Sequence, residues 1–127
     1  MTIGLWHTLT YTDADAGLAW MKAIGFTEKE VHRDPEDPTV IVHAEMLWPN
    51  GGGVMFGSHR PNPDWPTRPG YAAAYLVTDD VDGVFRAALD AGAKPLREPR
   101  DEPYGGRGAT VTDPEGNLWS FGSYAPA

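Results

Sequence analysis

The sequence predicts an α+β fold of two tandem strand–helix–strand–strand–strand repeats, which form a curved mixed sheet around a cleft with the helices outside. Two observations lead to this prediction. A short motif recurs near the end of each half of the chain, and the same order of hydrophobic periodicities precedes both copies. The 1–127 chain is therefore expected to be one domain, with repeat 1 at about 1–58, a connector at 59–70 and repeat 2 at about 71–124.

The recurring motif is a turn followed by a strand. Its first copy is WPNGGGVMFGS at residues 48–58, and its second is DPEGNLWSFGS at residues 113–123. When Pro49 is aligned with Pro114, the Pro, Gly, Phe, Gly and Ser residues coincide. Because proline restricts its own φ and glycine accepts a positive φ, this Pro-x-Gly spacing is typical of a tight turn.

A helical pattern of apolar residues lies near the start of each repeat. The first runs over residues 14–24, with Asp13 in front of it and Gly25 after it. The second follows Asp80 over residues 81–89 and also ends at a glycine. Aspartate is a favourable N-cap and glycine a favourable helix stop, so both segments are predicted to be helices with defined ends.

Segments with strand character precede and follow both helices. They span residues 5–11, 26–32, 39–48 and 54–58 in the first repeat, and 71–77, 93–98, 108–112 and 118–123 in the second. The connector contains four prolines, which disfavours regular structure. One repeat alone would leave a sheet face uncovered and an edge open, so the two repeats are expected to pack together.

The composition is that of an ordinary globular domain: 41% of residues are hydrophobic and 22% are charged. The absence of cysteine excludes disulfides, thiolate metal sites and cysteine nucleophiles. A formal net charge of -8 disfavours nucleic acid and anionic membranes as partners, and favours a neutral or cationic small ligand. No apolar stretch is long enough to span a membrane and no leader pattern is present, so the sequence predicts a cytoplasmic protein.

One segment is specific enough to indicate a family. YGGR at residues 104–107 is followed by DPEGNLW at residues 113–119. Within the predicted order of elements, the chain resembles the glyoxalase and bleomycin-resistance (vicinal oxygen chelate) superfamily nearly end to end. WSFG at 119–122 and HAE at 43–45 are most similar to its small bacterial single-domain members. In metal-dependent members, one divalent ion is held in the cleft by the first and last strands of each repeat.

The metal ligands that this resemblance implies are largely missing. It places carboxylate ligands at Met55 and Ser120, neither of which suits a hard or borderline divalent ion. The opening strand of the first repeat offers His7 or its neighbour Trp6, and the register leaves open which of them faces the cleft. The matching place in the second repeat is alanine. We therefore expect no metal ligand, no catalytic residue and no cofactor.

The favoured hypothesis is a metal-free binding protein of the bleomycin-resistance type, which sequesters an aromatic, neutral or cationic molecule such as an antibiotic. The chain has five tryptophans and five tyrosines, and aromatic walls bind planar ligands by stacking. The resemblance also implies a homodimer with its clefts at the subunit boundary. The candidate ligand-binding residues are Trp6, His7, Glu45, Met55, Trp65, Tyr75, Tyr104, Arg107 and Ser120.

Two alternatives stay open. One is a metal-dependent lyase, isomerase or dioxygenase with a site rebuilt around His7, His43 and Glu45. His43 and Glu45 are two positions apart, so they share one face of a strand. The other alternative is a dimeric accessory or regulatory module with a filled cleft and no small ligand.

Overall fold

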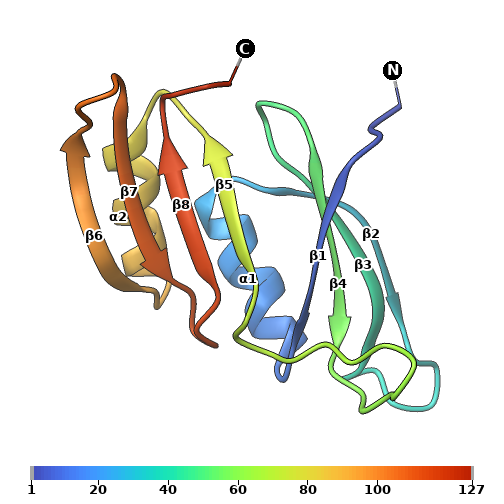
Figure 1. Cartoon of the computed structure of the whole chain (residues 1–127). Helices are drawn as coiled ribbons and strands as arrows, with labels where there is room; N and C mark the ends of the chain where they lie inside the picture. The colour runs from blue at the N-terminus through green and yellow to red at the C-terminus, as the bar shows by residue number, and fades with distance from the viewer. Residues whose placement is uncertain (1, 127) are drawn as a thin grey trace.

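The computed structural model describes residues 2–126 as two four-stranded sheets and two helices (Figure 1). The elements are β1 (Trp6–Tyr11), α1 (Ala14–Ile24), β2 (Thr27–Arg33), β3 (Ile41–Leu47), β4 (Gly53–Ser58), β5 (Ala73–Val77), α2 (Val81–Asp90), β6 (Lys94–Asp101), β7 (Arg107–Thr112) and β8 (Leu118–Gly122). This order confirms the predicted fold class and both strand–helix–three-strand repeats. Within residues 2–126, no helix is long and apolar enough to cross a membrane.

The two repeats have the same sheet topology. The strand orders are β1-β4-β3-β2 and β5-β8-β7-β6, and only the β1–β4 and β5–β8 pairs are parallel. The repeats were expected to share one larger sheet, but they form two separate sheets. A side chain occupies the boundary: the Trp48 indole, just after β3, donates a 2.8 Å hydrogen bond to the carbonyl oxygen of Val77 in β5. The Val77 carbonyl oxygen therefore has a hydrogen-bond donor, although no strand of the first repeat pairs with β5.

Both helices lie on the same side of the two sheets, and they contact each other (Figure 1). Each begins at the predicted cap: Asp13 Oδ1 accepts from the Ala16 N–H at 3.1 Å, and Asp80 Oδ1 accepts from the Gly83 N–H at 3.0 Å. Gly25 ends α1 with a φ of 125°, which a side chain would disfavour. The local sequence thus sets where both helices begin and where α1 stops.

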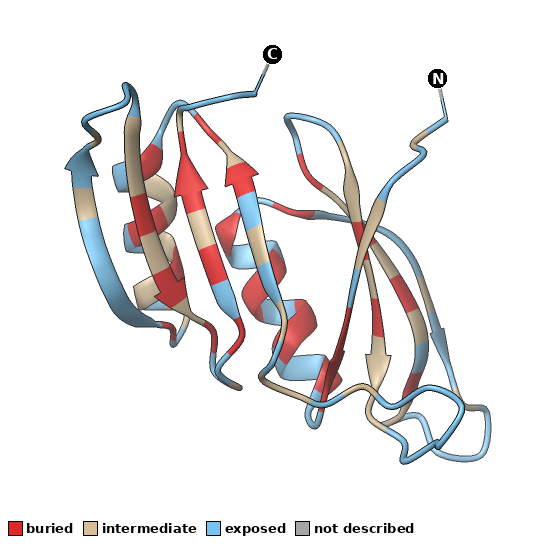
Figure 2. Cartoon of the chain, viewed as in Figure 1, coloured by how far each residue is buried: buried red, intermediate tan, exposed pale blue. Residues whose placement is uncertain are grey.

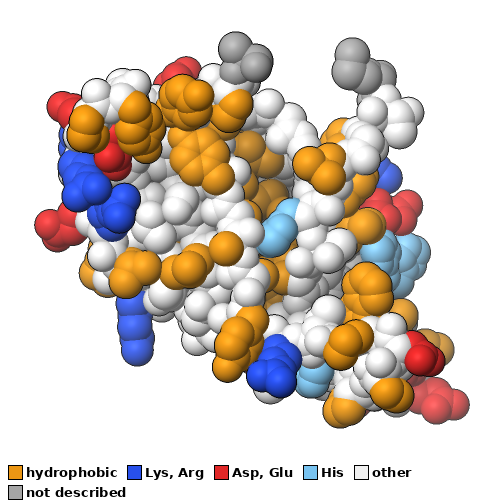
Figure 3. All heavy atoms as spheres, in the orientation of Figure 1, with side chains coloured by type: hydrophobic (Ala, Val, Ile, Leu, Met, Phe, Trp, Pro, Cys, Tyr) orange, Lys and Arg blue, Asp and Glu red, His pale blue; other side chains and the backbone are white. Residues whose placement is uncertain are grey.

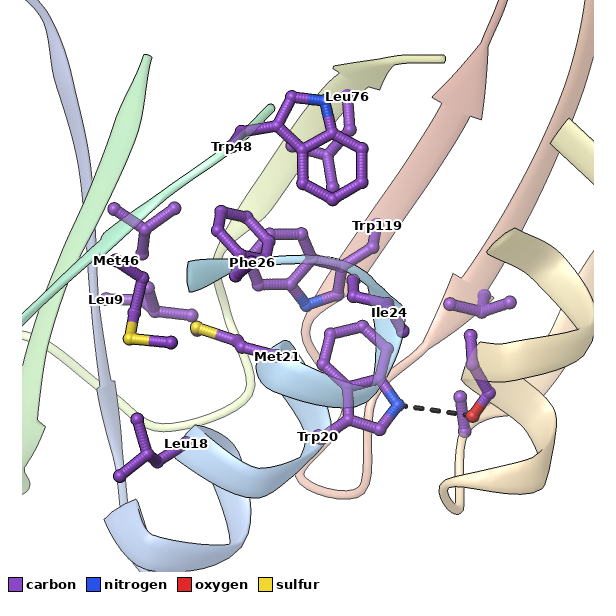
Figure 4. Close-up of a cluster of buried hydrophobic side chains, with 14 of the residues drawn as sticks. Leu9, Leu18, Trp20, Met21, Ile24, Phe26, Met46, Trp48, Leu76 and Trp119 are labelled. Carbon is purple, nitrogen blue, oxygen red and sulfur yellow. Dashed lines mark hydrogen bonds between the residues drawn. The ribbon is translucent and has the colours of Figure 1, made fainter. Parts of the chain in front are cut away.

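One hydrophobic core runs through both repeats on the helix side of the sheets (Figures 2 and 4). At its centre the rings of Trp20 and Trp119 lie 5.4 Å apart between centroids, and Phe26 lies 6.0 Å from Trp119. The Trp20 indole donates to the carbonyl oxygen of Ala88 in α2 at 3.2 Å. Helix α1 of the first repeat therefore packs against the second repeat, and the opposite sheet faces are left open.

A buried carboxylate also joins the repeats. Asp113, only 3% exposed, lies in the turn before β8. Its Oδ2 accepts hydrogen bonds from Tyr11 Oη at 2.7 Å, Asn117 Nδ2 at 3.0 Å and Trp119 Nε1 at 3.0 Å. Its Oδ1 accepts from the backbone N–H groups of Glu115 and Asn117, each at 3.0 Å. Five donors compensate for the burial of this charge, and one of them comes from β1 of the other repeat.

The next acidic residue of the same turn holds the start of α1. Glu115 Oε1 accepts from the Thr12 N–H at 2.6 Å, and Oε2 accepts from the Asp13 N–H at 2.7 Å. Burial and the Asp113 charge raise the pKa of Tyr11 far above its ordinary value, so its hydroxyl stays a donor. The Asp-Pro-Glu-Gly turn is thus a structural clamp on the first repeat.

Replacing Tyr11 with phenylalanine tests this clamp. The substitution removes one hydroxyl from a charged, buried hydrogen bond, while the ring keeps its edge-to-face contact with Phe56 at 5.5 Å. We expect Tyr11→Phe to lower the free energy of unfolding by about 1.5–3 kcal/mol, measured by urea denaturation.

The matched control is Tyr104→Phe, because the Tyr104 side chain is 68% exposed. This variant should change the free energy of unfolding by less than about 0.5 kcal/mol. Equal effects of the two substitutions would show that the Tyr11–Asp113 bond does not hold the repeats together.

Candidate ligand-binding cleft

The first sheet carries a cavity of about 420 Å³ on the face turned away from the helices. Its floor comes from β1, β3 and β4, and the 59–70 connector folds over one side of it. The lining residues are Thr8, Leu9, Thr10, Val42, His43, Met55, Phe56, Gly57, Ser58, Arg60, Asn62, Trp65 and Thr67. The volume is within the range of pockets that hold drug-sized ligands.

Strand alternation explains which side chains face this cleft. Leu9 is buried in the core, so its neighbours Thr8 and Thr10 lie on the other face of β1. Thr8 pairs with Met55 of β4 in the parallel ladder, so the two lie side by side on that face. Cleft and core are thus opposite faces of the same strands.

A β-bulge adds two neighbouring residues of β3 to the cleft. His43 pairs with His32, but the next pair joins Ile41 to Arg33, which leaves Val42 without a partner on β2. Ile41 is buried in the core, whereas Val42 and His43 both line the cleft. The extra residue breaks the regular alternation and so places two consecutive side chains on one face.

Trp65 forms part of the cleft's lip. Trp65 lines the cavity, although the residue is 62% exposed. Its N–H donates to the Asn62 carbonyl oxygen at 3.0 Å, and its own carbonyl oxygen accepts from the Thr67 N–H at 2.8 Å. These short-range bonds hold a proline-rich segment in a defined turn, which presents an indole at the edge of the cleft.

His43, which lines the cleft, is paired with a carboxylate that is not among the lining residues. His43 Nε2 lies 2.8 Å from Glu45 Oε2, and Glu45 Oε1 lies 3.3 Å from Lys29 Nζ. The hydrogen bonds from His43 and Lys29 lower the pKa of Glu45, so it is a carboxylate at neutral pH. The His32 ring stacks near the His43 ring, with centroids 6.4 Å apart.

The charge of the lining differs from that of the whole chain. No carboxylate side chain is among the lining residues, and Arg60 is the residue with a permanent charge. Arg60 Nη2 lies 3.3 Å from Asp34 Oδ2, and the pair is largely open to solvent. The carboxylates that give the chain its net charge of -8 therefore lie outside the lining.

Four of the residues proposed from sequence come together on this face. Met55 and Trp65 line the cleft, and Glu45 reaches it through its bond to His43. Trp6 lies on the same face of β1 as Thr8, with its ring over Gly53, where any side chain would collide with it.

His7 points to the opposite side of β1. Its ring meets Trp119 edge to face, with centroids 6.0 Å apart, beside a cavity of about 160 Å³ between the repeats. Its Nε2 is buried without a hydrogen-bond partner in the described chain, and burial lowers the pKa of the ring. A neutral imidazole packed near the core accounts for both facts. Trp6, rather than His7, shares the face of the cleft.

Tyr75 and Ser120 lie on the open face of the second sheet, away from the 420 Å³ cleft. The Tyr75 hydroxyl donates to the carbonyl oxygen of Tyr124 at 2.7 Å. Ser120 Oγ lies 2.9 Å from Thr110 Oγ1. Within one chain, these two residues are therefore separated from Met55 and Trp65.

The remaining two residues proposed from sequence lie near the β6–β7 turn. Arg107 makes a two-pronged ion pair with Asp82 at the start of α2, with Nε–Oδ2 and Nη2–Oδ1 distances of 2.8 and 2.9 Å. A further 3.2 Å contact joins Arg107 Nη1 to Asp101. The ring of Tyr104 packs edge to face on Tyr124. Arg107 thus holds α2 against β7.

The residues present do not fit the divalent ion of the superfamily. Thioether and hydroxyl groups stand at the two carboxylate positions, Met55 and Ser120, and His7 faces the core. His7 also lies across β1 from His43 and Glu45, so these three do not converge on one ion. In the described part of the chain, no three His, Cys, Asp or Glu side chains are grouped to hold a metal.

Val42, His43 and Arg60 line the cleft but are not among the ligand-binding residues that the sequence predicts. No local sequence pattern predicts the bulge that turns Val42 outward. The sequence suggests His43 only as a partner in a rebuilt metal site. Arg60 lies in the proline-rich connector, whose path over the first sheet depends on tertiary contacts.

Comparison with known proteins places the chain among two-repeat folds of this kind. TioX from Micromonospora sp. ML1 is 28% identical, with a TM-score of 0.77 over 98% of this chain and 100% of TioX. A bleomycin resistance determinant encoded on transposon Tn5 has a TM-score of 0.66 at 20% identity, over 98% of this chain and 100% of that one. The second likeness shows the fold alone.

Two mycobacterial sequences are similar over most of this chain. "Putative glyoxylase CFP32" of Mycobacterium tuberculosis is 28% identical over 123 residues, which cover 96% of this chain and 44% of that protein. The chain thus spans less than half the length of this relative. An uncharacterized protein of Mycobacterium bovis is 34% identical over 104 residues, covering 76% of this chain and 68% of its own length.

The sequence also matches a family model, over residues 5–121. This match covers both repeats, the cleft and the Asp113 turn. The chain belongs to the Glyoxalase/Bleomycin resistance protein/Dioxygenase superfamily.

Proposed function

We propose that this protein binds and sequesters a small aromatic molecule in the cleft of the first sheet, without a metal and without turnover. The observation that carries the proposal is the lining of the 420 Å³ cavity: an indole, a thioether and a valine side chain beside several hydroxyl groups. Such a cleft offers apolar contact area and a few polar contacts that orient a ligand.

The lining supports a neutral ligand more strongly than a cationic one. Arg60 lines the cleft and no carboxylate side chain does, so a cation finds no direct partner there. The acidic outer surface raises the local concentration of cations only at long range, and salt screens this effect. An aromatic antibiotic is one ligand of this class, in keeping with the resemblance to bleomycin-resistance proteins. The cytoplasmic location is likewise a proposal that rests on the sequence.

A homodimer would complete the cleft. Large apolar side chains are exposed on the second sheet and its loops, and Figure 3 shows hydrophobic side chains on the open faces of both repeats. Exposed residues of this set are Tyr71, Tyr75, Tyr104, Leu118 and Tyr124. Several large apolar side chains exposed on one repeat support an interaction site there. If the second sheet of a partner covers the first sheet, Tyr75 and Ser120 of the partner approach Met55.

The first experiment for this function is a thermal-shift and calorimetric screen with aromatic antibiotics, bleomycin among them. At least one compound is expected to bind, and Trp65→Ala should weaken its binding about 2- to 13-fold because one stacking contact of about 0.5–1.5 kcal/mol is lost.

Leu96→Ala provides the control for this screen. It also shortens an exposed apolar side chain, but it lies on β6 outside the cleft. Its affinity for the ligand should equal that of the unmodified protein. A panel without any binder would argue against sequestration of aromatic ligands.

Metal content tests the proposed absence of a metal. Elemental analysis of the untagged protein, incubated with zinc, manganese and iron and then desalted, should find far less than one ion per chain. Thioether and hydroxyl groups at the two carboxylate positions cannot hold these ions against water. One tightly held ion per chain would instead revive the metal-dependent enzyme as the function.

Analytical ultracentrifugation tests the dimer. The protein should sediment as a dimer at micromolar concentrations, and Leu118→Arg should weaken self-association about tenfold or more, because a charge would replace an apolar contact on the open face of β8. Leu96→Arg, on the outer strand β6, is the control and should leave the dimer intact. A monomer at all concentrations would contradict the proposed closure of the cleft.

A further inference from the structure

We propose that His43 is a proton acceptor for the ligand, and that the ligand carries an acidic hydroxyl group on an aromatic ring. This inference rests on the proposed function, because it names the chemical group that the cleft recognises. It assigns a role to His43, Glu45 and Lys29 that does not involve a metal.

The neighbours of His43 determine which ring nitrogen is free. Glu45 is ionised and can only accept hydrogen bonds, so the His43 Nε2 at 2.8 Å must carry the proton. Lys29 holds the other carboxylate oxygen at 3.3 Å and fixes the orientation of Glu45. In the neutral ring, Nδ1 is then the unprotonated nitrogen, and no hydrogen bond within residues 2–126 engages it.

Two hydroxyl groups of the cleft already bond to the protein backbone. Thr10 Oγ1 donates to the Gly57 carbonyl oxygen at 3.3 Å, and Ser58 Oγ accepts from the Ile41 N–H at 2.9 Å. His43, by contrast, has a side chain that is 40% exposed and lines the cavity, with one ring nitrogen unused. Among the described lining residues, only His43 carries a ring nitrogen that can take up a proton from a ligand.

The chemistry of a phenol matches this acceptor. On binding, the ligand O–H bond breaks, an N–H bond forms at His43 Nδ1, and the ligand oxygen becomes a phenolate. The Glu45 carboxylate on the other side of the ring stabilises the imidazolium. Arg60 adds a positive charge to the same cleft, which favours the phenolate. An ether or a hydrogen at the same place on the ligand could not transfer a proton.

Binding of such a ligand should weaken at high pH. Above the pKa of the free ligand, the proton to be shared has been lost. The charged groups that face His43 are Glu45 on β3, Lys29, Glu30 and His32 on β2, and Arg60 in the connector.

The test uses umbelliferone, a planar coumarin with one phenol, and its O-methyl ether. The unmodified protein should bind umbelliferone about tenfold more tightly than the ether, which corresponds to one charge-assisted hydrogen bond. Bound umbelliferone should show the absorption band of its anion at a pH below the pKa of the free compound. That band reports proton transfer and would not arise from stacking alone.

Two variants locate the acceptor. His43→Phe keeps a ring against His32 but has no nitrogen, so it should bind both coumarins equally and leave umbelliferone neutral. Glu45→Gln removes the charge that supports the imidazolium, so it should reduce the anion band while retaining affinity for the ether. Affinity for the ether in both variants shows that the cleft is still folded. Long-range proton–nitrogen NMR should find the Nε2–H form of His43 in the free protein.

Four outcomes would overturn the inference about His43. Equal binding of the two coumarins by the unmodified protein, an unchanged preference in His43→Phe, or the Nδ1–H form of His43 would overturn this inference and leave aromatic binding intact. If neither coumarin binds, the inference about a phenolic ligand is overturned, and the antibiotic panel decides whether the cleft binds aromatic molecules.

Discussion

The hydrogen bonds around the Asp113 carboxylate are the contact on which the arrangement of the two repeats depends. A buried negative charge is costly unless donors surround it, and here the donors come from its own turn, from β8 and from β1. The requirement is stringent because Tyr11 lies 102 positions away in the chain. Its hydroxyl reaches Asp113 only when the first repeat packs against the second. Glu115 extends the same constraint to the start of α1.

The polar residues that hold the fold together are therefore different from those that line the cleft. The Asp-Pro-Glu-Gly-Asn segment is rich in acidic and polar groups, yet every one of its described contacts orders the fold. The core takes the helix side of both sheets, which leaves the opposite face of the first sheet for a cleft. There, threonine hydroxyls, Met55 and the His43–Glu45 pair stand on strands whose other faces are locked in the core. A rigid support of this kind keeps a binding site ready before the ligand arrives.

The open faces of the two sheets differ. The first sheet has a cavity with an indole at its edge, whereas the second sheet has an open face with exposed tyrosines. The two positions at which the family resemblance implies carboxylate ligands lie on these two faces, at Met55 and Ser120. Thioether and hydroxyl groups there do not suit a divalent ion, and this supports the proposed metal-free binding.

Local sequence patterns predict the helices and strands of this protein, whereas the cleft depends on tertiary contacts. Periodicity, the caps at Asp13 and Asp80 and the stop at Gly25 predicted both helices, because these signals act within one or two turns of chain. Likewise, alternation identified Met55 as a cleft residue. The bulge at Val42 and the Arg107–Asp82 pair carry no local signal. The path of the connector, which brings Trp65 and Arg60 to the first sheet, carries none either. These features arise from contacts between segments far apart in the chain, and such contacts exist only once the two repeats have packed on their shared core.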